Sequence, residues 1–363
     1  FFSAVAMAPR ALECGGACPS LEPISAKPVA ASVPLTDHCG QPHTQALMAM
    51  ACVLVREGSC SLPYELIHII LEFSRPFLGK KIKTLKGHTG PVLCLTVYYG
   101  HLFSGSDDTT IRMWQADGRC SRVLTGHRAA VRCMTTWNGR LLSGSGDGSV
   151  RVWDRRGDEI KALITGHGPV LCMTTMKDKL FTGTVGGDVR MWNTHGDIEK
   201  QMLGHRGTVW CLTTFQGNVY SGSTDGTIRM WSAAGEPLRE MQGHREIVCA
   251  LVGLGKTLCS ISLGSTLHTW SLDGDFLQQL PCSKDRCLTV LSGKLVSGTV
   301  DGSIRLWDLD RPPRCRSPTL SKGLHSQYVR KQIKAHNGPV VCVAAFSQYL
   351  FSGSEDGSIA LWV

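Results

Sequence analysis

Serine, histidine and aspartate recur together along the chain, and these are the residue types of a nucleophilic catalytic triad. In one segment they are His127, Ser143 and Asp147. A hydrolase needs one such set, whereas this set returns in four segments and always with a tryptophan, as a buried hydrogen-bond network would. We therefore predict a structural role and no enzyme activity. The four sets are His88, Ser104, Asp108 and Trp114; His127, Ser143, Asp147 and Trp153; His205, Ser221, Asp225 and Trp231; and His336, Ser352, Asp356 and Trp362.

The glycine-rich run at 144–148, Gly-Ser-Gly-Asp-Gly, is similar to a loop that cradles a phosphate. Such loops need a following helix whose N-terminus faces the anion. Residues 149–153, Ser-Val-Arg-Val-Trp, have the pattern of a strand instead. We expect no nucleotide, no cofactor and no small-molecule substrate.

Four residues near the beginning of the sequence are of the types that bind zinc: Cys14, Cys18, Cys39 and His43. A tetrahedral site needs four ligands. However, the twenty residues between the two pairs match no zinc-site spacing and are rich in proline and alanine. The sequence therefore predicts no metal site.

Seven of the sixteen cysteines recur at what we interpret as one repeat position, five or six residues after the start of each repeat. Equivalent positions in separate repeats cannot all pair, and a cysteine inside an apolar run acts as a small buried hydrophobe. This usage predicts a reducing compartment, so we expect an intracellular protein of the cytoplasm or nucleus. The seven are Cys94, Cys133, Cys172, Cys211, Cys249, Cys287 and Cys342.

These residues are held in a unit of about 40 residues that repeats seven times. Short alternating or β-branched runs, separated by Gly, Asp and Asn turns, predict that each unit is a small antiparallel sheet. The unit is marked by tryptophans that lie 39, 39, 39, 39, 37 and 55 residues apart: Trp114, Trp153, Trp192, Trp231, Trp270, Trp307 and Trp362.

Over residues 81–363 the repeat resembles the WD-repeat family, through Gly126-His127, the Ser-Gly-Ser run at 143–145, Asp147 and Trp153. The resemblance implies an all-β, seven-bladed β-propeller. It also implies that histidine, serine, aspartate and tryptophan form one network inside each blade. Three repeats depart from the pattern, so we expect weaker networks there. Gly186 replaces aspartate in the third, Gly264 does so in the fifth, and Pro281-Cys282 replaces Gly-His in the sixth.

The two ends of the repeat region predict a closed ring. The outermost strand of each unit precedes the next histidine, and the last repeat stops after Trp362 without one. Residues 81–85 have the sequence pattern of such a strand. We expect them to complete the last sheet, which removes its exposed edge.

In the family's ring, the residue after each histidine and the residue before each turn aspartate face one rim. The resemblance therefore nominates eight partner-binding residues: Thr89, Asp107, Arg128, Arg206, Thr224, Arg245, Asn337 and Glu355.

The residues before the repeats are expected to form two segments. Residues 1–44 mix Pro, Ala, Ser and Gly without periodicity, which predicts a flexible leader. Residues 45–78 are expected to be a helical extension, with a helix over 62–73 whose first turn holds Pro63 and Glu65. Residues 62–71 resemble the first helix of an F-box, and with Met48 and Cys52 the segment is similar to a SOCS box. Either resemblance implies a ubiquitin-ligase adaptor, whereas the interpretation we favour is a helical pair packed on the propeller.

The last tryptophan spacing is long because of an insertion that we place at residues 311–334. It holds Arg311, Arg314, Arg316 and Lys322, three further basic residues and no acidic one. Such a segment could bind an acidic partner or an RNA backbone. Its one aromatic residue is Tyr328, and single-stranded RNA binding relies on aromatic stacking. We favour a solvated loop and do not expect a nucleic-acid partner.

The composition agrees with a folded scaffold. Hydrophobic residues make up 42% and charged residues 18%, and no apolar run approaches the roughly 18 residues of a membrane span. Because a ring of loops displays a rigid surface, we predict a non-catalytic scaffold or adaptor that binds other proteins. The alternatives are a substrate-recognition subunit of a ubiquitin ligase, or the targeting domain of a larger kinase or ligase.

Overall fold

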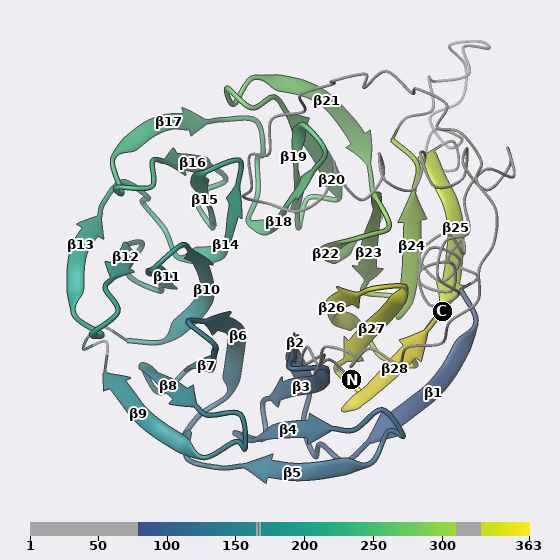
Figure 1. Ribbon diagram of the computed structural model, residues 1–363. Helices are drawn as coiled ribbons and strands as arrows, with labels where there is room; N and C mark the ends of the chain where they lie inside the picture. Colours follow the sequence, from purple (N-terminus) through teal and green to yellow (C-terminus); the bar gives the residue numbers. More distant parts are fainter. Residues whose placement is uncertain (1–78, 165, 167, 283, 310–327) are drawn as a thin grey trace, which may run out of the picture. The chain divides into compact units, whose positions relative to one another are not determined.

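The computed structural model describes residues 79–164, 166, 168–282, 284–309 and 328–363. These residues form seven four-stranded antiparallel sheets, and Figure 1 shows the sheets as blades around a common centre. The predicted all-β, seven-bladed propeller is confirmed. The expected leader and helical extension, the residues Cys14, Cys18, Cys39 and His43, and the basic residues Arg311, Arg314, Arg316 and Lys322 lie outside the described residues.

Each blade is numbered from its innermost strand outward. Blade one is β2 (Val92–Tyr98), β3 (His101–Ser106), β4 (Ile111–Trp114) and β5 (Cys120–Leu124). Blade two is β6 (Val131–Trp137), β7 (Arg140–Ser145), β8 (Ser149–Trp153) and β9 (Glu159–Ile164). Blade three is β10 (Val170–Met176), β11 (Lys179–Thr184), β12 (Val189–Trp192) and β13 (Ile198–Met202). Blade four is β14 (Val209–Phe215), β15 (Asn218–Ser223), β16 (Ile228–Trp231) and β17 (Pro237–Met241).

The remaining three blades follow the same order. Blade five is β18 (Val248–Leu254), β19 (Thr257–Ser262), β20 (Thr266–Trp270) and β21 (Phe276–Pro281). Blade six is β22 (Asp285–Leu291), β23 (Lys294–Thr299), β24 (Ser303–Trp307) and β25 (Val329–Lys334). Blade seven is β26 (Val340–Phe346), β27 (Tyr349–Ser354), β28 (Ser358–Trp362) and, from the other end of the described chain, β1 (Lys81–Lys86).

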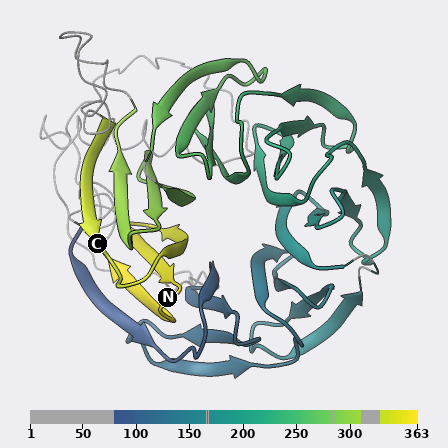
Figure 2. The same ribbon diagram turned by 180° about the vertical axis from the view of Figure 1, so that it is seen from behind.

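The ring closes through β1, as the sequence predicted. This strand pairs antiparallel with β28, and Leu85 lies opposite Ile359. Leu85 is buried in a cluster that joins blade seven to Trp114 of blade one. The reverse view in Figure 2 shows β1 running along the outside of the last blade. The last sheet therefore has four strands like the others.

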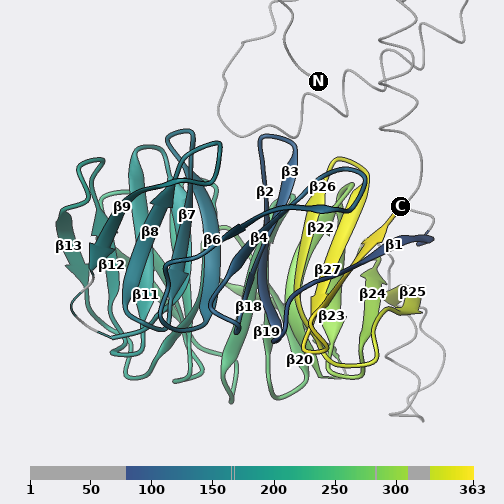
Figure 3. The same cartoon turned by 90° about the horizontal axis from the view of Figure 1, so that it is seen from below.

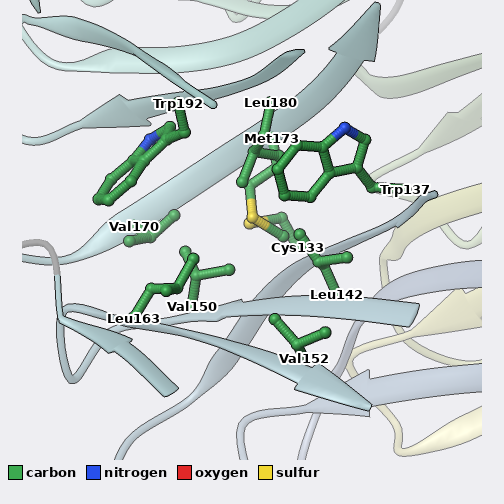
Figure 4. Packing of buried hydrophobic residues seen from close by; sticks show 10 residues of the cluster. All are labelled: Cys133, Trp137, Leu142, Val150, Val152, Leu163, Val170, Met173, Leu180 and Trp192. Carbon is green, nitrogen blue, oxygen red and sulfur yellow. The ribbon is translucent and has the colours of Figure 1, made fainter. Parts of the chain in front are cut away.

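The hydrophobic core lies between neighbouring blades rather than within any one of them. The cluster in Figure 4 combines Leu142 and Val152 of blade two with Val170 and Trp192 of blade three. Each interface has its own cluster of this kind, so the blades support one another around the ring.

Every innermost strand carries a β-bulge at its second residue. In β2, Val92 pairs with Ser106 and Cys94 with Gly105, so Leu93 is the extra residue. A Cβ added to Gly105 would lie 2.7 Å from the Cys94 sulfur and 2.6 Å from a Val131 methyl of the next blade. The glycine of the Ser-Gly-Ser run is therefore needed for close packing of blade on blade.

The bulge corrects the interpretation of the seven cysteines. Cys249 is the bulge residue of β18, and Ala250 holds the position that cysteine holds in the other six blades. Ile261 lies opposite Ala250. In the other six blades the equivalent pair is a glycine opposite a cysteine. A smaller residue on one strand is thus matched by a larger one on its neighbour, which conserves the packed volume.

The predicted basic insertion is also corrected, because its last residues are not a loop. Arg330, Lys331 and Lys334 belong to β25, the outermost strand of blade six. Tyr328 precedes that strand and is buried in the core cluster next to Trp307. The propeller therefore resumes at Tyr328, within the range that the tryptophan spacing assigned to the insertion.

The disc has two rims, which Figure 3 shows from the side. One rim, here called the histidine rim, holds the loops that enter the innermost strands and the turns between second and third strands. In blade one the two are joined by a hydrogen bond from the Asp107 amide to the Pro91 carbonyl, at 3.0 Å. The opposite rim holds the tight turns between first and second strands and the turns between third and fourth strands.

Candidate protein-binding rim

The histidine rim rests on one hydrogen-bond network per blade, which blade one shows in full. His88 Nε2 lies 2.7 Å from Ser104 Oγ, and His88 Nδ1 lies 2.8 Å from an Asp108 oxygen. Trp114 donates its indole N–H to Ser104 Oγ at 2.8 Å. A neutral His88 that carries its proton on Nδ1 satisfies all three contacts. Burial favours this neutral form, because it lowers the pKa of His88.

The aspartate of the network fixes the rim loop. Asp108 accepts the backbone N–H of Thr89 at 3.1 Å and the hydroxyl of Thr110 at 2.6 Å. Burial raises the pKa of Asp108, but hydrogen bonds from Thr110 and His88 outweigh it and lower the pKa to about 2. The carboxylate is therefore charged at neutral pH, and it holds the loop through a charge-assisted bond.

Blades two, four and seven repeat this arrangement. The histidine Nε2 to serine Oγ distances are 2.7 Å for His127 and Ser143, 2.7 Å for His205 and Ser221, and 2.8 Å for His336 and Ser352. The histidine Nδ1 lies 3.2 Å from Asp147 in blade two and 3.1 Å from Asp225 in blade four. In blade seven His336 Nδ1 instead contacts the Ser358 hydroxyl at 2.9 Å and lies 3.7 Å from Asp356, beyond hydrogen-bond range. The serine of each set also accepts the indole N–H of Trp153, Trp231 or Trp362.

This geometry matches the order of a catalytic triad, but the serine cannot act as a nucleophile. Ser104, Ser143, Ser221 and Ser352 each have 0% of their surface exposed. A nucleophile must reach the carbonyl of a substrate. The arrangement therefore supports a structural role for all four sets.

Blades three, five and six, whose repeats depart from the sequence pattern, replace the missing side chains in different ways. In blade five, where Gly264 replaces aspartate, His244 lies 2.7 Å from Ser260 and its Nδ1 has only the Thr266 hydroxyl, at 3.2 Å. Its ring stacks on His268 at 3.8 Å between centroids. In this blade the network lacks a carboxylate, as expected.

In blade three Asp188 supplies the carboxylate two residues after Gly186. It accepts an N–H from Arg190 at 2.6 Å, and both side chains are buried. Trp192 donates to Thr182, at 2.9 Å, where the other blades have serine. The histidine of this repeat, His167, lies outside the described residues.

In blade six the expectation of a weaker network is wrong. Asp285, at the position where the other innermost strands begin with valine, is fully buried. It accepts a hydrogen bond from Ser297 at 2.7 Å and lies 3.2 Å from an Arg305 nitrogen. A buried ion pair thus replaces the histidine.

The structure places the nominated rim residues on the histidine rim. Seven are exposed, and Thr224 is half-buried. The backbone N–H groups of Arg128, Arg206 and Asn337 bind the turn aspartates, as that of Thr89 does. Glu355 forms an ion pair with Arg286 of blade six at 2.7 Å.

Sequence reasoning missed a third group of rim residues, namely those in the bulges of the innermost strands. The signal was available, because six of the seven directly precede a recurring cysteine. A bulge re-aims the side chain that it carries, and among these residues Trp210 is the largest, with 44% of its surface exposed. The group is Leu93, Arg132, Leu171, Trp210, Cys249, Arg286 and Val341.

Exposed apolar side chains gather in one sector of this rim. Val185 of blade three is 45% exposed and Leu263 of blade five 42%, on either side of Trp210 in blade four. Thr208, two residues before Trp210, donates its hydroxyl to the Val185 carbonyl at 3.1 Å, which ties blades three and four together here. Within the described residues, the same rim of blades one, six and seven has no exposed large hydrophobic side chain. We call Val185, Trp210 and Leu263 the apolar sector.

Exposed arginines and one exposed carboxylate, Glu246 beside Gly264, flank the apolar sector. Arg206 and Arg245 are exposed beside it in blades four and five. Five cations of this rim, the two arginines with Arg128, Arg132 and Lys284, form no ion pair within the described residues. A surface of this kind combines an aromatic anchor with arginines, the residue types that dominate binding energy at protein interfaces.

Two family comparisons cover most of the ring. The family described as "WD domain, G-beta repeat" matches residues 79–115, 235–308 and 327–363. The family described as "IP5P C-F beta-propeller" matches residues 123–231.

Comparisons with individual proteins add a distant relative and a fold. "Zinc finger CCCH domain-containing protein 62" of Arabidopsis thaliana is 33% identical over 75 residues, which are 21% of this chain and 16% of that protein. The chain therefore spans a small part of the length of this relative. The crystal structure of the computationally designed Ika8 protein has a TM-score of 0.62 and 22% identity, and covers 78% of this chain and 99% of its own. At this identity the likeness shows the fold alone.

Within the described ranges, no helix is long and apolar enough to cross a membrane.

Proposed function

We propose that this chain, whose WD repeats form a seven-bladed ring, is a non-catalytic scaffold or adaptor that binds other proteins through its histidine rim. The observation that carries the proposal is the exposed Trp210 at the centre of the apolar sector. Exposed apolar side chains rimmed by polar residues are typical of interaction sites, and tryptophan is among the residue types most enriched at binding hot spots.

The rim is suited to binding because it is rigid. The loop residues Thr89, Arg128, Arg206 and Asn337 are each held by a turn aspartate. Little conformational entropy is then lost when a partner docks on them. The proposed partner surface has an apolar side chain that covers Trp210 and carboxylates that face Arg206 and Arg245.

The proposal is tested by comparing quantitative pull-downs with wild type, Trp210→Asp and a control. Trp210→Asp places a charge in the apolar sector and should lower the affinity for a rim partner at least thirtyfold, which is about 2 kcal/mol. The control is Leu238→Asp, since Leu238 is 51% exposed on the outer strand β17. Proteins bound equally by both variants and the wild type would contradict the role of the rim. Each captured protein is then re-measured in purified form by calorimetry.

We also propose an intracellular location. None of the ten described cysteines forms a disulfide, and four of the recurring ones, Cys94, Cys133, Cys172 and Cys342, are buried. Burial raises the pKa of Cys94 to about 12, which keeps the thiol protonated and unreactive. The same chain expressed with a secretion signal should gain no disulfides in its folded form, which mass spectrometry of alkylated protein would reveal.

A further inference from the structure

A concave site lies on the rim opposite the histidine rim, between blades two and three. It is a cavity of about 390 Å³, within the range of sites that take a small ligand or a side chain of a partner. Its wall on one side is β7, β8 and β9 of blade two. On the other side it is the turn of Thr194 and His195, which joins β12 to β13 in blade three.

The floor of this cavity is apolar. Leu142, Val152 and Leu163 line the floor, and all three are buried in the cluster of Figure 4. Trp137, from the same cluster, also lines the cavity. Ile160 lies at the mouth and is 46% exposed. An apolar group that enters the cavity would cover Ile160 and be removed from water on several sides, which is favourable at about 25 cal/mol per Å².

A cation at the mouth lacks the carboxylate that its equivalents have. Arg140 begins β7 and is exposed. In blade three the equivalent Lys179 binds both carboxylate oxygens of Glu199, each at 2.7 Å. In blade six Lys294 binds Asp308 at 3.0 Å. The equivalent of Asp308 in blade two is Asp154, which accepts the backbone N–H groups of Arg156 and Asp158 in its own turn. Arg140 forms no ion pair within the described residues.

The outer strand explains why Arg140 has no pair like that of Lys179 with Glu199. Trp153 pairs with Glu159 and Val152 with Lys161, which leaves Ile160 as the bulge residue of β9. Glu199 is the bulge residue of β13 by the same register. Ile160 therefore stands where blade three places the carboxylate. The mouth also holds Lys161, whose ammonium donates to the His195 carbonyl at 2.8 Å and keeps two further donors.

We propose that this cavity binds a short acidic segment of a partner protein, which inserts one aliphatic side chain and places a neighbouring carboxylate on Arg140 and Lys161. The partner's carboxylate takes the place that Glu199 holds for Lys179. The site is separate from the histidine rim, and neither proposal depends on the other.

The test is a selection of random dodecapeptides displayed on phage against the full chain and its Ile160→Glu variant. The substitution gives Arg140 the carboxylate that blade three has and puts a charge at the mouth of the cavity. Peptides enriched on the wild type should carry Asp or Glu next to Leu, Ile or Val. Synthetic copies should bind Ile160→Glu at least tenfold more weakly by fluorescence anisotropy, and their affinity should fall when salt is raised from 50 to 500 mM, because exposed charges are screened.

The matched control is Ile198→Glu, which changes an exposed isoleucine of the neighbouring strand β13 that does not line the cavity. It should bind the peptides like the wild type, and all three proteins should melt within a few degrees of one another. Enriched peptides that lack acidic residues, or that bind Ile160→Glu as tightly as the wild type, would overturn the proposal, as would a selection that enriches nothing. Peptides that depend on Trp210 but not on Ile160 would be assigned to the histidine rim and would also count against this site.

Discussion

The carboxylate of Asp285 accepts a hydrogen bond from the hydroxyl of Ser297 at 2.7 Å, and so does for blade six what histidine does in the other blades. Ser297 in turn accepts the indole N–H of Trp307 at 2.8 Å. Asp285 is also 3.2 Å from Arg305, which is 5% exposed. The blade thus keeps a satisfied network although its repeat has lost the Gly-His pair.

Asp285→Ala should strongly destabilise the ring. It leaves the guanidinium of Arg305 buried without its carboxylate, and breaking such a pair costs about 3–5 kcal/mol. The double variant Asp285→Val with Arg305→Leu replaces the pair by apolar side chains, as the valines of the other blades do, and should recover much of the loss. Urea denaturation followed by tryptophan fluorescence measures both. A single variant that loses less than about 1 kcal/mol would show that Arg305 is not dependent on this aspartate.

Alanine substitutions of the adjacent residues Asp107 and Asp108 form a matched test of how much the turn network stabilises the fold. Asp108→Ala removes the acceptor of the Thr89 amide and of Thr110, and should cost about 1–3 kcal/mol of unfolding free energy. Asp107→Ala changes an exposed side chain one residue earlier and should be close to neutral. Thermal melts of the two variants make the comparison. Equal losses would mean that the hydrogen bonds of Asp108 do not carry the effect.

Gly105→Ala should destabilise the interface between blades one and two, because its methyl group would lie 2.7 Å from the Cys94 sulfur and 2.6 Å from Val131. Overpacking of this kind costs about 1–3 kcal/mol. Adding Cys94→Ala removes the sulfur and should recover part of the loss, as Ala250 does opposite Ile261 in blade five. Gly139→Ala is not a suitable control, since its φ of 67° adds strain. Failure of Cys94→Ala to improve the melting temperature of Gly105→Ala would contradict the packing account.

Stability should fall when the pH is lowered through the histidine range. Burial lowers the pKa of His88, His127, His205 and His336, and it lowers the pKa of His244 to about 3. These side chains stay neutral in the folded chain, whereas the unfolded chain binds protons below about pH 6.5. Each contributes a loss of up to about 1.4 kcal/mol per pH unit below that value.

The melting temperature should therefore be nearly constant from pH 8 to pH 7 and fall steeply from pH 6.5 to pH 5. Below about pH 4 a further loss is expected, because the pKa of Asp108 is lowered to about 2 in the folded chain and the unfolded chain then binds the extra proton. Differential scanning calorimetry across this range measures the effect. A melting temperature that holds or rises between pH 6.5 and pH 5 would mean that the histidines are protonated in the folded chain.

Most of the fold could be predicted from the sequence because one pattern repeats along the chain. The offsets that join His127, Ser143, Asp147 and Trp153 are local, because every partner lies within one blade. Seven returns of one local pattern fix the number of blades, and the strand pattern of residues 81–85 was enough to predict how the ring closes.

Single-residue shifts in register were not readable, because a strand that gains or loses one residue turns every later side chain to the other face. The bulge in β18 makes Cys249 the extra residue of that strand. Ala250 therefore takes the position that cysteine holds in the other six blades. The segment between Trp270 and β22 is two residues shorter than its equivalents and lacks the histidine, and Asp285 bonds to Ser297 in its place.

The sequence by itself determined the repeated network, because its members are close along the chain and bond to one another whatever the neighbouring blades are. The tertiary structure alone decided which side chains are left uncovered. Trp210 is exposed because a bulge re-aims it, and Arg140 lacks a carboxylate because Ile160 of the outer strand stands where Glu199 stands one blade later. Exposure and pairing depend on strands that lie far apart in the repeat, so only their assembled register places the surfaces that we propose for binding.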